Sequence, residues 1–106
     1  MWAEYFKERE GYETLETDKA CLSYKIAGEE CYIKDIFVLK EHRRSMVGSD
    51  LADKCADIAR NSGCKFLSGT VVPSTNGATA SLKGLFAYGF EVKSSHEDLI
   101  ILTKDL

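Results

Sequence analysis

An apolar stretch from Tyr32 to Leu39 is interrupted only by the adjacent charges Lys34 and Asp35. Continuous apolar positions are typical of a strand that is covered on both faces, whereas alternating positions indicate a strand with one face in water. We therefore predict that residues 32–39 form the central strand of a sheet. The two charges either lie at an exposed start of this strand, which is the favoured alternative, or have a function.

The segments before this strand show the alternation and the turn residues of a β-meander. Residues 12–16 alternate weakly, and residues 21–26 form a second candidate strand. Turns are predicted at residues 17–19 and 28–30, because they contain Asp and Gly beside polar residues. Together with the central strand, these segments predict three antiparallel strands.

Residues 1–9 are predicted to form a short helix, because Trp2, Tyr5 and Phe6 share one helical face. An aromatic face of this kind needs a cover. The favoured cover is the sheet of the same domain, and the alternative is a partner or a second copy of the chain.

Beyond the central strand the apolar spacing becomes helical. Between Gly48 and Ser62 the apolar residues Leu51, Cys55, Ile58 and Ala59 follow helical spacing. The charged residues Asp53, Lys54, Asp57 and Arg60 fall away from them. Gly63 is expected to end this helix in a left-handed conformation. Turn residues 73–76 precede a second helix, which is expected to end at Gly89. Its predicted buried stripe is Ala78, Leu82, Leu85 and Phe86.

Residues 66–72 are apolar and β-branched, and residues 90–93 and 99–103 read as a terminal hairpin across the polar loop 94–98. Because a helix joins 66–72 to the central strand, these two strands are expected to be parallel neighbours with a right-handed crossover. The order is three antiparallel strands, helix, strand, helix and hairpin. It predicts an α+β domain with a mixed sheet.

The length of 106 residues predicts one domain, spanning residues 1–106. A net charge of -3 argues against a general nucleic-acid or membrane binder. Charged residues crowd the first eleven positions, so no signal peptide or membrane span is expected there. The protein is expected to be cytoplasmic.

The cysteines show no C-x-x-C spacing and fall in predicted strands and helices, which favours reduced core residues. They are Cys21, Cys31, Cys55 and Cys64. A zinc site of Cys31, His42, Cys55 and Cys64 is an alternative that their spacing does not support. No metal is expected, and no catalytic role is assigned to His42 or His96.

The basic turn of residues 40–47 connects the central strand to the first long helix. Lys40, Arg43 and Arg44 supply positive charge, and the first helical turn adds unpaired N–H groups and the positive end of the helix dipole. Asp50 and Asp53, early in the helix, compete with a bound anion. We predict that this turn holds a phosphorylated ligand.

These segments resemble the GNAT superfamily of acetyl-CoA-dependent N-acetyltransferases, in a compact form. The resemblance covers most of the chain in the correct order, in the segments Asp35–Val38, Arg43–Leu51, Asn76–Leu82 and Tyr88–Phe90. The family's cofactor loop follows the pattern R/Q-x-x-G-x-G/A. Arg43, Met46 and Gly48 occupy its fixed positions, and Met46 departs from the usual glycine.

The resemblance implies a site for acetyl-CoA as cosubstrate. It implies that Ile36, Phe37 and Val38 splay from the parallel strand and pair with the pantetheine arm. It also implies that backbone N–H groups of one loop cradle the pyrophosphate. That loop comprises Arg43, Arg44, Ser45, Met46, Val47, Gly48 and Ser49. Asn76 resembles the family residue beside the pantetheine and the thiol.

Acetyl transfer in the family needs a base that takes the ammonium proton of the attacking amine. The positions that often carry the family's carboxylate are Lys34 and Tyr32 here. Asp35 is the nearest acid and is our candidate base. Strict alternation places it on the face opposite Lys34, unless a bulge redirects it.

The family's general acid, a tyrosine of the second helix, is missing, because its position falls on Lys83 or Leu85 depending on the alignment. Tyr88 is our candidate substitute. A residue just before a helix-ending glycine more often packs, and Ser81 is an equal alternative.

The resemblance favours an enzyme that moves an acetyl group from acetyl-CoA to a primary amine by direct attack. One alternative is a non-catalytic module of the same fold that binds CoA or a protein partner. Another is an unrelated α+β fold in which residues 40–44 form a solvated turn. The acceptor is a small molecule, a protein lysine or an amino terminus. The chain is short for the family, so its acceptor site is either open or completed by a second copy in a homodimer.

Overall fold

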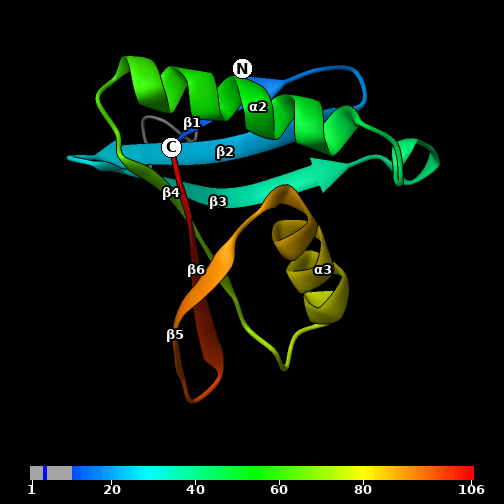
Figure 1. Cartoon of the computed structure of the whole chain (residues 1–106). Coiled ribbons are helices and arrows are strands. Elements are labelled where there is room, and N and C mark those ends of the chain that lie inside the picture. The colour runs from blue at the N-terminus through cyan, green and yellow to red at the C-terminus, as the bar shows by residue number, and fades with distance from the viewer. Residues whose placement is uncertain (1–3, 5–10) are drawn as a thin grey trace.

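The computed structural model describes Glu4 and residues 11–106, so the predicted helix of residues 1–9 lies outside the described part. The strands are β1 (Glu13–Glu16), β2 (Ala20–Ala27), β3 (Glu30–Val38), β4 (Phe66–Val71), β5 (Glu91–His96) and β6 (Leu99–Asp105). The helices are the 3-10 helix η1 (Lys40–His42), α2 (Val47–Asn61) and α3 (Ala78–Tyr88). Figure 1 shows this arrangement.

One six-stranded mixed sheet has the order β1-β2-β3-β4-β6-β5. β3 and β4 are parallel, as the sequence predicts, and every other neighbouring pair is antiparallel. β6 lies between β4 and β5, so the final hairpin joins the sheet through its second strand. The predicted α+β architecture with a mixed sheet is confirmed.

The core lies between the sheet and α2, which lies over β2 and β3 in Figure 1 and runs along them. Leu51, Cys55 and Ala59 of α2 are buried at helical spacing. They meet strand residues that are completely buried, namely Leu22, Cys31, Leu67 and Leu102. Gly63 follows the helix with a φ of +88°, the left-handed conformation that glycine adopts readily.

The prediction that the central strand is covered on both faces is wrong. Lys34, Asp35 and Phe37 of β3 are exposed, and Phe37 retains 49% of its accessible surface. The two charges also do not lie at the start of the strand, because β3 begins at Glu30. They lie at an irregularity where β2 shifts its register against β3.

That irregularity is a bulge at Lys34. Tyr24 of β2 is opposite Ile33, and the preceding Ser23 is opposite Asp35, so Lys34 has no partner residue in β2. The bulge shifts the alternation by one residue. Cys31 and Ile33 are buried before it, whereas Ile36 and Val38 are the half-buried residues after it. Asp35 therefore leaves the helix-covered face.

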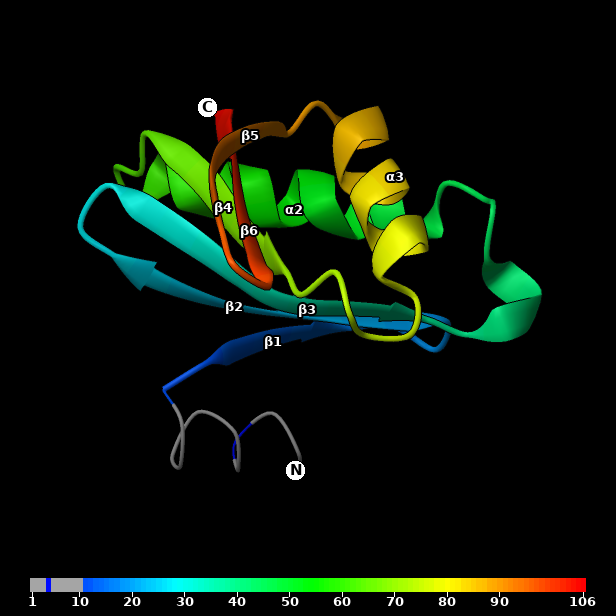
Figure 2. The ribbon, with the colours of Figure 1, turned by 90° about the horizontal axis from the view of Figure 1, so that it is seen from below.

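The second helix, α3, lies on the same side of β1–β3 as α2 (Figure 2). Ala78 is buried, and Leu82 and Leu85 pack against the core. Leu85 packs over Gly69 of β4, and its Cδ2 would lie 4.0 Å from a Cβ added there, which is an ordinary contact distance. The predicted stripe is wrong at Phe86, which is 49% exposed, because the helix turns Tyr88 inward instead.

The terminal hairpin is longer than predicted. β5 continues through the polar residues Ser94, Ser95 and His96, and only Glu97 and Asp98 separate it from β6. All six β5 residues are exposed, and β5 is an edge strand of the sheet. Polar residues are compatible with such a strand, although their sequence predicts a loop. Glu97 makes the turn with a φ of 52°.

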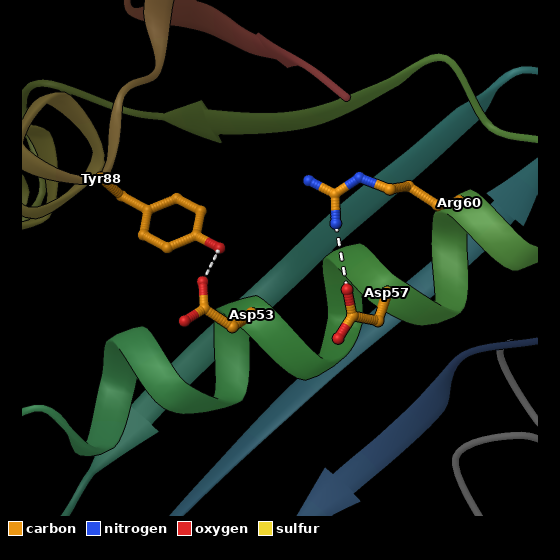
Figure 3. A network of polar contacts seen from close by, with 4 residues as sticks. All are labelled: Asp53, Asp57, Arg60 and Tyr88. Atoms are coloured by element: carbon orange, nitrogen blue, oxygen red, sulfur yellow. Dashed lines mark hydrogen bonds and ion pairs between the residues drawn. The ribbon is translucent and has the colours of Figure 1, made fainter.

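A hydrogen bond from Tyr88 ties α3 to α2. Its hydroxyl donates to Asp53 Oδ1 at 2.6 Å, and the two side chains approach each other across the helices in Figure 3. Lys104 Nζ lies 5.6 Å from the centre of the Tyr88 ring. On α2 itself, Asp57 pairs with Arg60 one helical turn further along. The Tyr88 hydroxyl thus fixes the spacing of the two helices.

We expect Tyr88→Phe to lower the free energy of unfolding by about 0.5–1.5 kcal/mol near neutral pH, because one partly exposed hydrogen bond to a carboxylate is lost. Burial and the bond to Asp53 raise the pKa of the Tyr88 hydroxyl. The contribution of this bond is therefore present below the unfolded tyrosine pKa of about 10 and is lost as the pH rises beyond it.

Denaturant unfolding of both proteins at several pH values measures this difference. The matched control is Tyr12→Phe, because the Tyr12 hydroxyl makes no hydrogen bond to the residues that the structure describes. A stability difference between wild type and Tyr88→Phe that does not shrink above pH about 10 would contradict the assignment.

Candidate functional site

The parallel strands β3 and β4 pair only over their first residues. Their register joins Glu30 with Phe66, Cys31 with Leu67 and Tyr32 with Ser68, and it ends there. β4 continues alongside β6 and β3 continues alongside β2, so the two strands diverge (Figure 1). We call this divergence the fork. Beyond Tyr32, the β4-facing edge of β3 pairs with no strand among the residues that the structure describes, so its backbone polar groups are available to other molecules.

The predicted residues Ile36, Phe37 and Val38 lie on this unpaired stretch of β3. Ile36 and Val38 pack partly against the core, whereas Phe37 is exposed on the opposite face. The splaying that the resemblance implies is therefore present in the fold. A role of these residues in binding stays a prediction.

The loop after β3 is braced on the end of that strand. Arg43 Nε donates to the Val38 carbonyl oxygen at 2.9 Å, and the Arg43 guanidinium lies 5.6 Å from the centre of the Phe37 ring. Ser45 Oγ donates to the His42 carbonyl oxygen and accepts a 3.4 Å bond from the Val47 N–H. Arg43 thus fixes the loop, in addition to any contact with a ligand.

Arg44 adopts a left-handed conformation with a φ of 61°. Non-glycine residues rarely adopt this conformation, and a left-handed residue in a turn directs successive N–H groups to one side, which suits an anion. The Arg44 side chain is exposed. The sequence offers no signal for this conformation, because nothing distinguishes Arg44 from Arg43 in it.

The amino terminus of α2 completes the loop. Its first residue is Val47, one residue before the predicted start, and no side chain caps the helix at Met46. Gly48 lies against the strand end, since a Cβ built on it would be 3.5 Å from Val38 Cγ2. Met46 is 67% exposed, and Ser49 is half-buried in the first turn. The uncapped helix terminus and the unpaired strand edge are therefore adjacent.

Asn76 lies in the turn between β4 and α3, just before the helix begins at Ala78. Asp98 of the hairpin turn holds this segment, because its carboxylate accepts bonds from the Ser74 N–H at 3.0 Å and from Ser74 Oγ. The Asn76 side chain is exposed and makes no hydrogen bond to the residues that the structure describes.

The candidate base and acid lie on different parts of the fold. Asp35 is exposed beside the bulge, on the face of the sheet away from α2. Tyr88 lies on the helix side, where its hydroxyl already donates to Asp53 and its raised pKa keeps it protonated. Ser81 is exposed on α3. The structure does not bring Asp35 and Tyr88 into contact.

Sequence reasoning missed a pair of hydroxyls at the fork. Tyr32 Oη and Thr70 Oγ1 lie 3.0 Å apart and join β3 to β4 just where the backbone pairing ends. Two residues earlier on each strand, Ser68 Oγ donates to Glu30 Oε2 at 2.5 Å. In the sequence, Tyr32 is marked only because it occupies a position that often carries the family's carboxylate. Thr70 is not marked at all, because the sequence does not show which residues of the two strands lie opposite each other.

The cysteine cluster is a core feature. Cys31 Sγ and Cys55 Sγ lie 3.7 Å apart, and all four cysteines are free; Cys21 is only half-buried. Within the described part of the chain, no group of His, Cys, Asp and Glu could hold a metal ion. No helix among the described residues is long and apolar enough to cross a membrane.

Comparison with known proteins relates this geometry to solved structures. The PaiA N-acetyltransferase of Thermoplasma acidophilum in complex with coenzyme A is similar, with a TM-score of 0.78 and 14% identity over 97% of this chain and 67% of that chain. A GNAT family acetyltransferase of Elizabethkingia anophelis with acetyl-CoA bound has a TM-score of 0.74 and 19% identity, over 97% and 82% of the two chains. At these identities the likeness shows the fold.

No curated protein matches the sequence. The model of the acetyltransferase (GNAT) family matches residues 3–87, which is most of the chain and includes the fork, the loop and α2. The chain therefore belongs to the GNAT acetyltransferase family.

Proposed function

We propose that this protein transfers an acetyl group from acetyl-CoA to a primary amine by direct attack. The observation that carries the proposal is the fork, where the unpaired edge of β3 lies beside the uncapped amino terminus of α2. Membership of the family and the CoA or acetyl-CoA complexes among its structural neighbours support it.

The residues at the fork fit both ends of acetyl-CoA. The pantetheine arm carries amides, and the unpaired edge of β3 from Ile36 to Val38 offers backbone donors and acceptors for them, although Arg43 already donates to the Val38 oxygen. The pyrophosphate is an anion, for which the first turn of α2 offers N–H groups and its dipole. Arg44 adds positive charge and the left-handed turn. Exposed Asp50 opposes this field, so the proposal requires the basic residues of the loop to outweigh it.

Acetyl-CoA supplies the acetyl group as a thioester: a C–N bond to the amine forms and the C–S bond breaks. The leaving thiolate takes the second proton that the attacking nitrogen loses, so that CoA departs as the thiol. Asp35 accepts the proton that the ammonium form of the acceptor must lose before attack. The bulge at Lys34 supports this role, because it places Asp35 on the exposed face together with Phe37. Tyr88 braces α3 against α2 through Asp53 and is not needed as the acid in this proposal.

The acceptor reaches the fork from the exposed face of the sheet. A hollow of about 340 Å³ on that face is lined by β1, β2 and the end of β3, with Ser23, Cys21 and Phe37 among its residues. Cys21 pairs with Phe37 and Lys25 pairs with Tyr32, so the hollow lies five residues along β3 from the start of the fork. It offers room for a part of the acceptor molecule away from the reacting amine. We further propose that the enzyme acts in the cytoplasm on an amine and not on nucleic acid or membranes, and that a homodimer completes its acceptor site.

A non-catalytic module that binds CoA is the second candidate function. The observation that favours it is the commitment of the Tyr88 hydroxyl to Asp53, which leaves no tyrosine of α3 free as a general acid. Binding of acetyl-CoA without turnover on any amine would select this candidate.

We expect calorimetric titration to show micromolar binding of acetyl-CoA by the wild type and binding at least about tenfold weaker by Gly48→Trp, a loss of about 1.4 kcal/mol. An indole at Gly48 would fill the space between α2 and the strand end. Gly48→Ala is the control, because its Cβ makes an ordinary 3.5 Å contact with Val38 and should leave most of the affinity. Equal affinity of wild type and Gly48→Trp would refute this location.

The two arginines should differ in their response to salt. Arg44→Ala should weaken CoA binding more at low than at high ionic strength, because its exposed charge acts through a screened field. Arg43→Ala should weaken CoA binding to a similar extent at low and at high ionic strength, because it removes the hydrogen bond to the Val38 oxygen that braces the loop. Titrations at two salt concentrations measure this, and identical salt dependence of the two variants would exclude the division of roles.

Asp35→Asn should reduce acetyl transfer chiefly below the pH optimum. At low pH most of the acceptor is ammonium, and without the carboxylate no side chain at this position takes its proton. Turnover at different pH values, followed by thiol release on the best acceptor of an amine panel, measures the effect. An unaltered pH profile would return Asp35 to a structural role at the bulge.

A further inference from the structure

A row of polar side chains joins β3 and β4 on the face of the sheet opposite α2 and α3. Cys31 and Leu67 are buried on the helix side, and the alternation of both strands places Glu30, Tyr32, Ser68 and Thr70 on the other side. Ser68 bonds Glu30 and Tyr32 bonds Thr70. Within the described part of the chain, these are the side-chain hydrogen bonds that connect the two strands.

The two bonds occupy different places relative to the fork. Ser68 is only 2% exposed, and it belongs to the last backbone pair with Tyr32. Thr70 lies two residues further along β4, beyond the end of the pairing, and it is exposed. The Tyr32–Thr70 bond therefore crosses the beginning of the fork and is open to solvent on its far side.

Hydrogen-bonding capacity remains at this pair. A hydroxyl offers one donor and two acceptor lone pairs, so one mutual bond leaves Tyr32 and Thr70 with acceptors on both oxygens and a donor on one. Neither side chain makes another hydrogen bond to the residues that the structure describes. The pair matches an N–H group that enters from the exposed face.

Carboxylates lie on both sides of the hydroxyl pair along β3, and two lysines lie beside them. Glu30 and Asp35 lie along β3 on either side of Tyr32, with Asp35 just beyond the bulge. Lys25 is opposite Tyr32 in β2, and its Nζ lies 5.8 Å from the centre of the Tyr12 ring; Lys34 is the bulged residue. The hydroxyl pair lies between the two carboxylates along the strand direction.

We propose that Tyr32 and Thr70 hold the nitrogen of the acceptor amine, whose N–H group donates to their oxygens while Asp35 takes the proton that the ammonium loses. The inference rests on the proposed acetyl transfer and adds two amine-holding residues to it. The amine then approaches the fork from the face opposite the helices, and the hydroxyls orient its lone pair toward the fork.

The test uses two bisubstrate probes and needs no turnover. In one, the sulfur of CoA carries –CH2–C(=O)–NH–propyl, and in the other it carries the ester –CH2–C(=O)–O–propyl, so the probes differ by a single N–H group. The wild type should bind the amide about three- to tenfold more tightly than the ester, which is the usual range for one net hydrogen bond. Calorimetry measures both affinities, together with that of acetyl-CoA.

Tyr32→Phe and Thr70→Val remove one hydroxyl each and keep the shape of the side chain. In either variant the amide-to-ester ratio should fall to about one, whereas the affinity for acetyl-CoA should stay near its wild-type value. The melting temperature should fall by a similar few degrees in both variants, because each loses the same mutual bond. Tyr12→Phe is the control, because Tyr12 is not part of the hydroxyl pair, and it should keep the wild-type amide-to-ester ratio.

The outcomes separate this inference from the function on which it rests. If the wild type binds the amide and the ester equally, or if both variants keep the wild-type amide-to-ester ratio, the inference is wrong. Binding of acetyl-CoA in the same experiments would still support the proposed function. Failure of acetyl-CoA and both probes to bind the wild type would overturn the proposed function and the inference together.

Discussion

The structure depends on how briefly β3 and β4 pair. Two parallel strands joined by a helix would be expected to pair along their whole length, and here the register stops at Tyr32 and Ser68. Buried or half-buried backbone groups seldom go without hydrogen-bond partners, so a strand edge left unpaired inside a sheet needs water or a ligand. The bulge at Lys34 redirects β3 at the same point, and Leu85 of α3 packs against Gly69 on β4. The fork is thus built into the packing of the sheet.

The charge of the site follows from what the fork brings together. Arg43 donates a hydrogen bond to the last carbonyl oxygen of β3, which holds the basic loop at the end of the strand. Gly48 in the first turn of α2 lies against Val38, so the N–H groups of this turn lie beside the end of β3. Tyr88 and Asp53 hold the second helix at a fixed distance from the first. One side of the fork therefore offers N–H groups and positive charge, and the amine site that we propose, with Tyr32 and Asp35, lies on the other side.

The sequence predicts the helices and strands well, but it predicts poorly how they contact one another. Periodicity is a local property, so the order of strands and helices, the parallel crossover and the left-handed Gly63 follow from it, and the family follows from Arg43, Gly48 and the segments around them. The bulge at Lys34 depends on the neighbouring strand, and the bond between Tyr32 and Thr70 depends on a register between residues far apart in the chain. The roles predicted for the site residues stay predictions, because they concern a ligand.

The most direct measurement is an amide NMR titration of the isotopically labelled protein with CoA, which reports on each backbone N–H separately. The account predicts that the largest shifts cluster on Ile36 to Val38 of β3 and on Val47 to Ser49 of α2, because these groups line the fork and the helix terminus. Shifts concentrated on the β5–β6 hairpin, or spread evenly over the sheet with none at the fork, would contradict it.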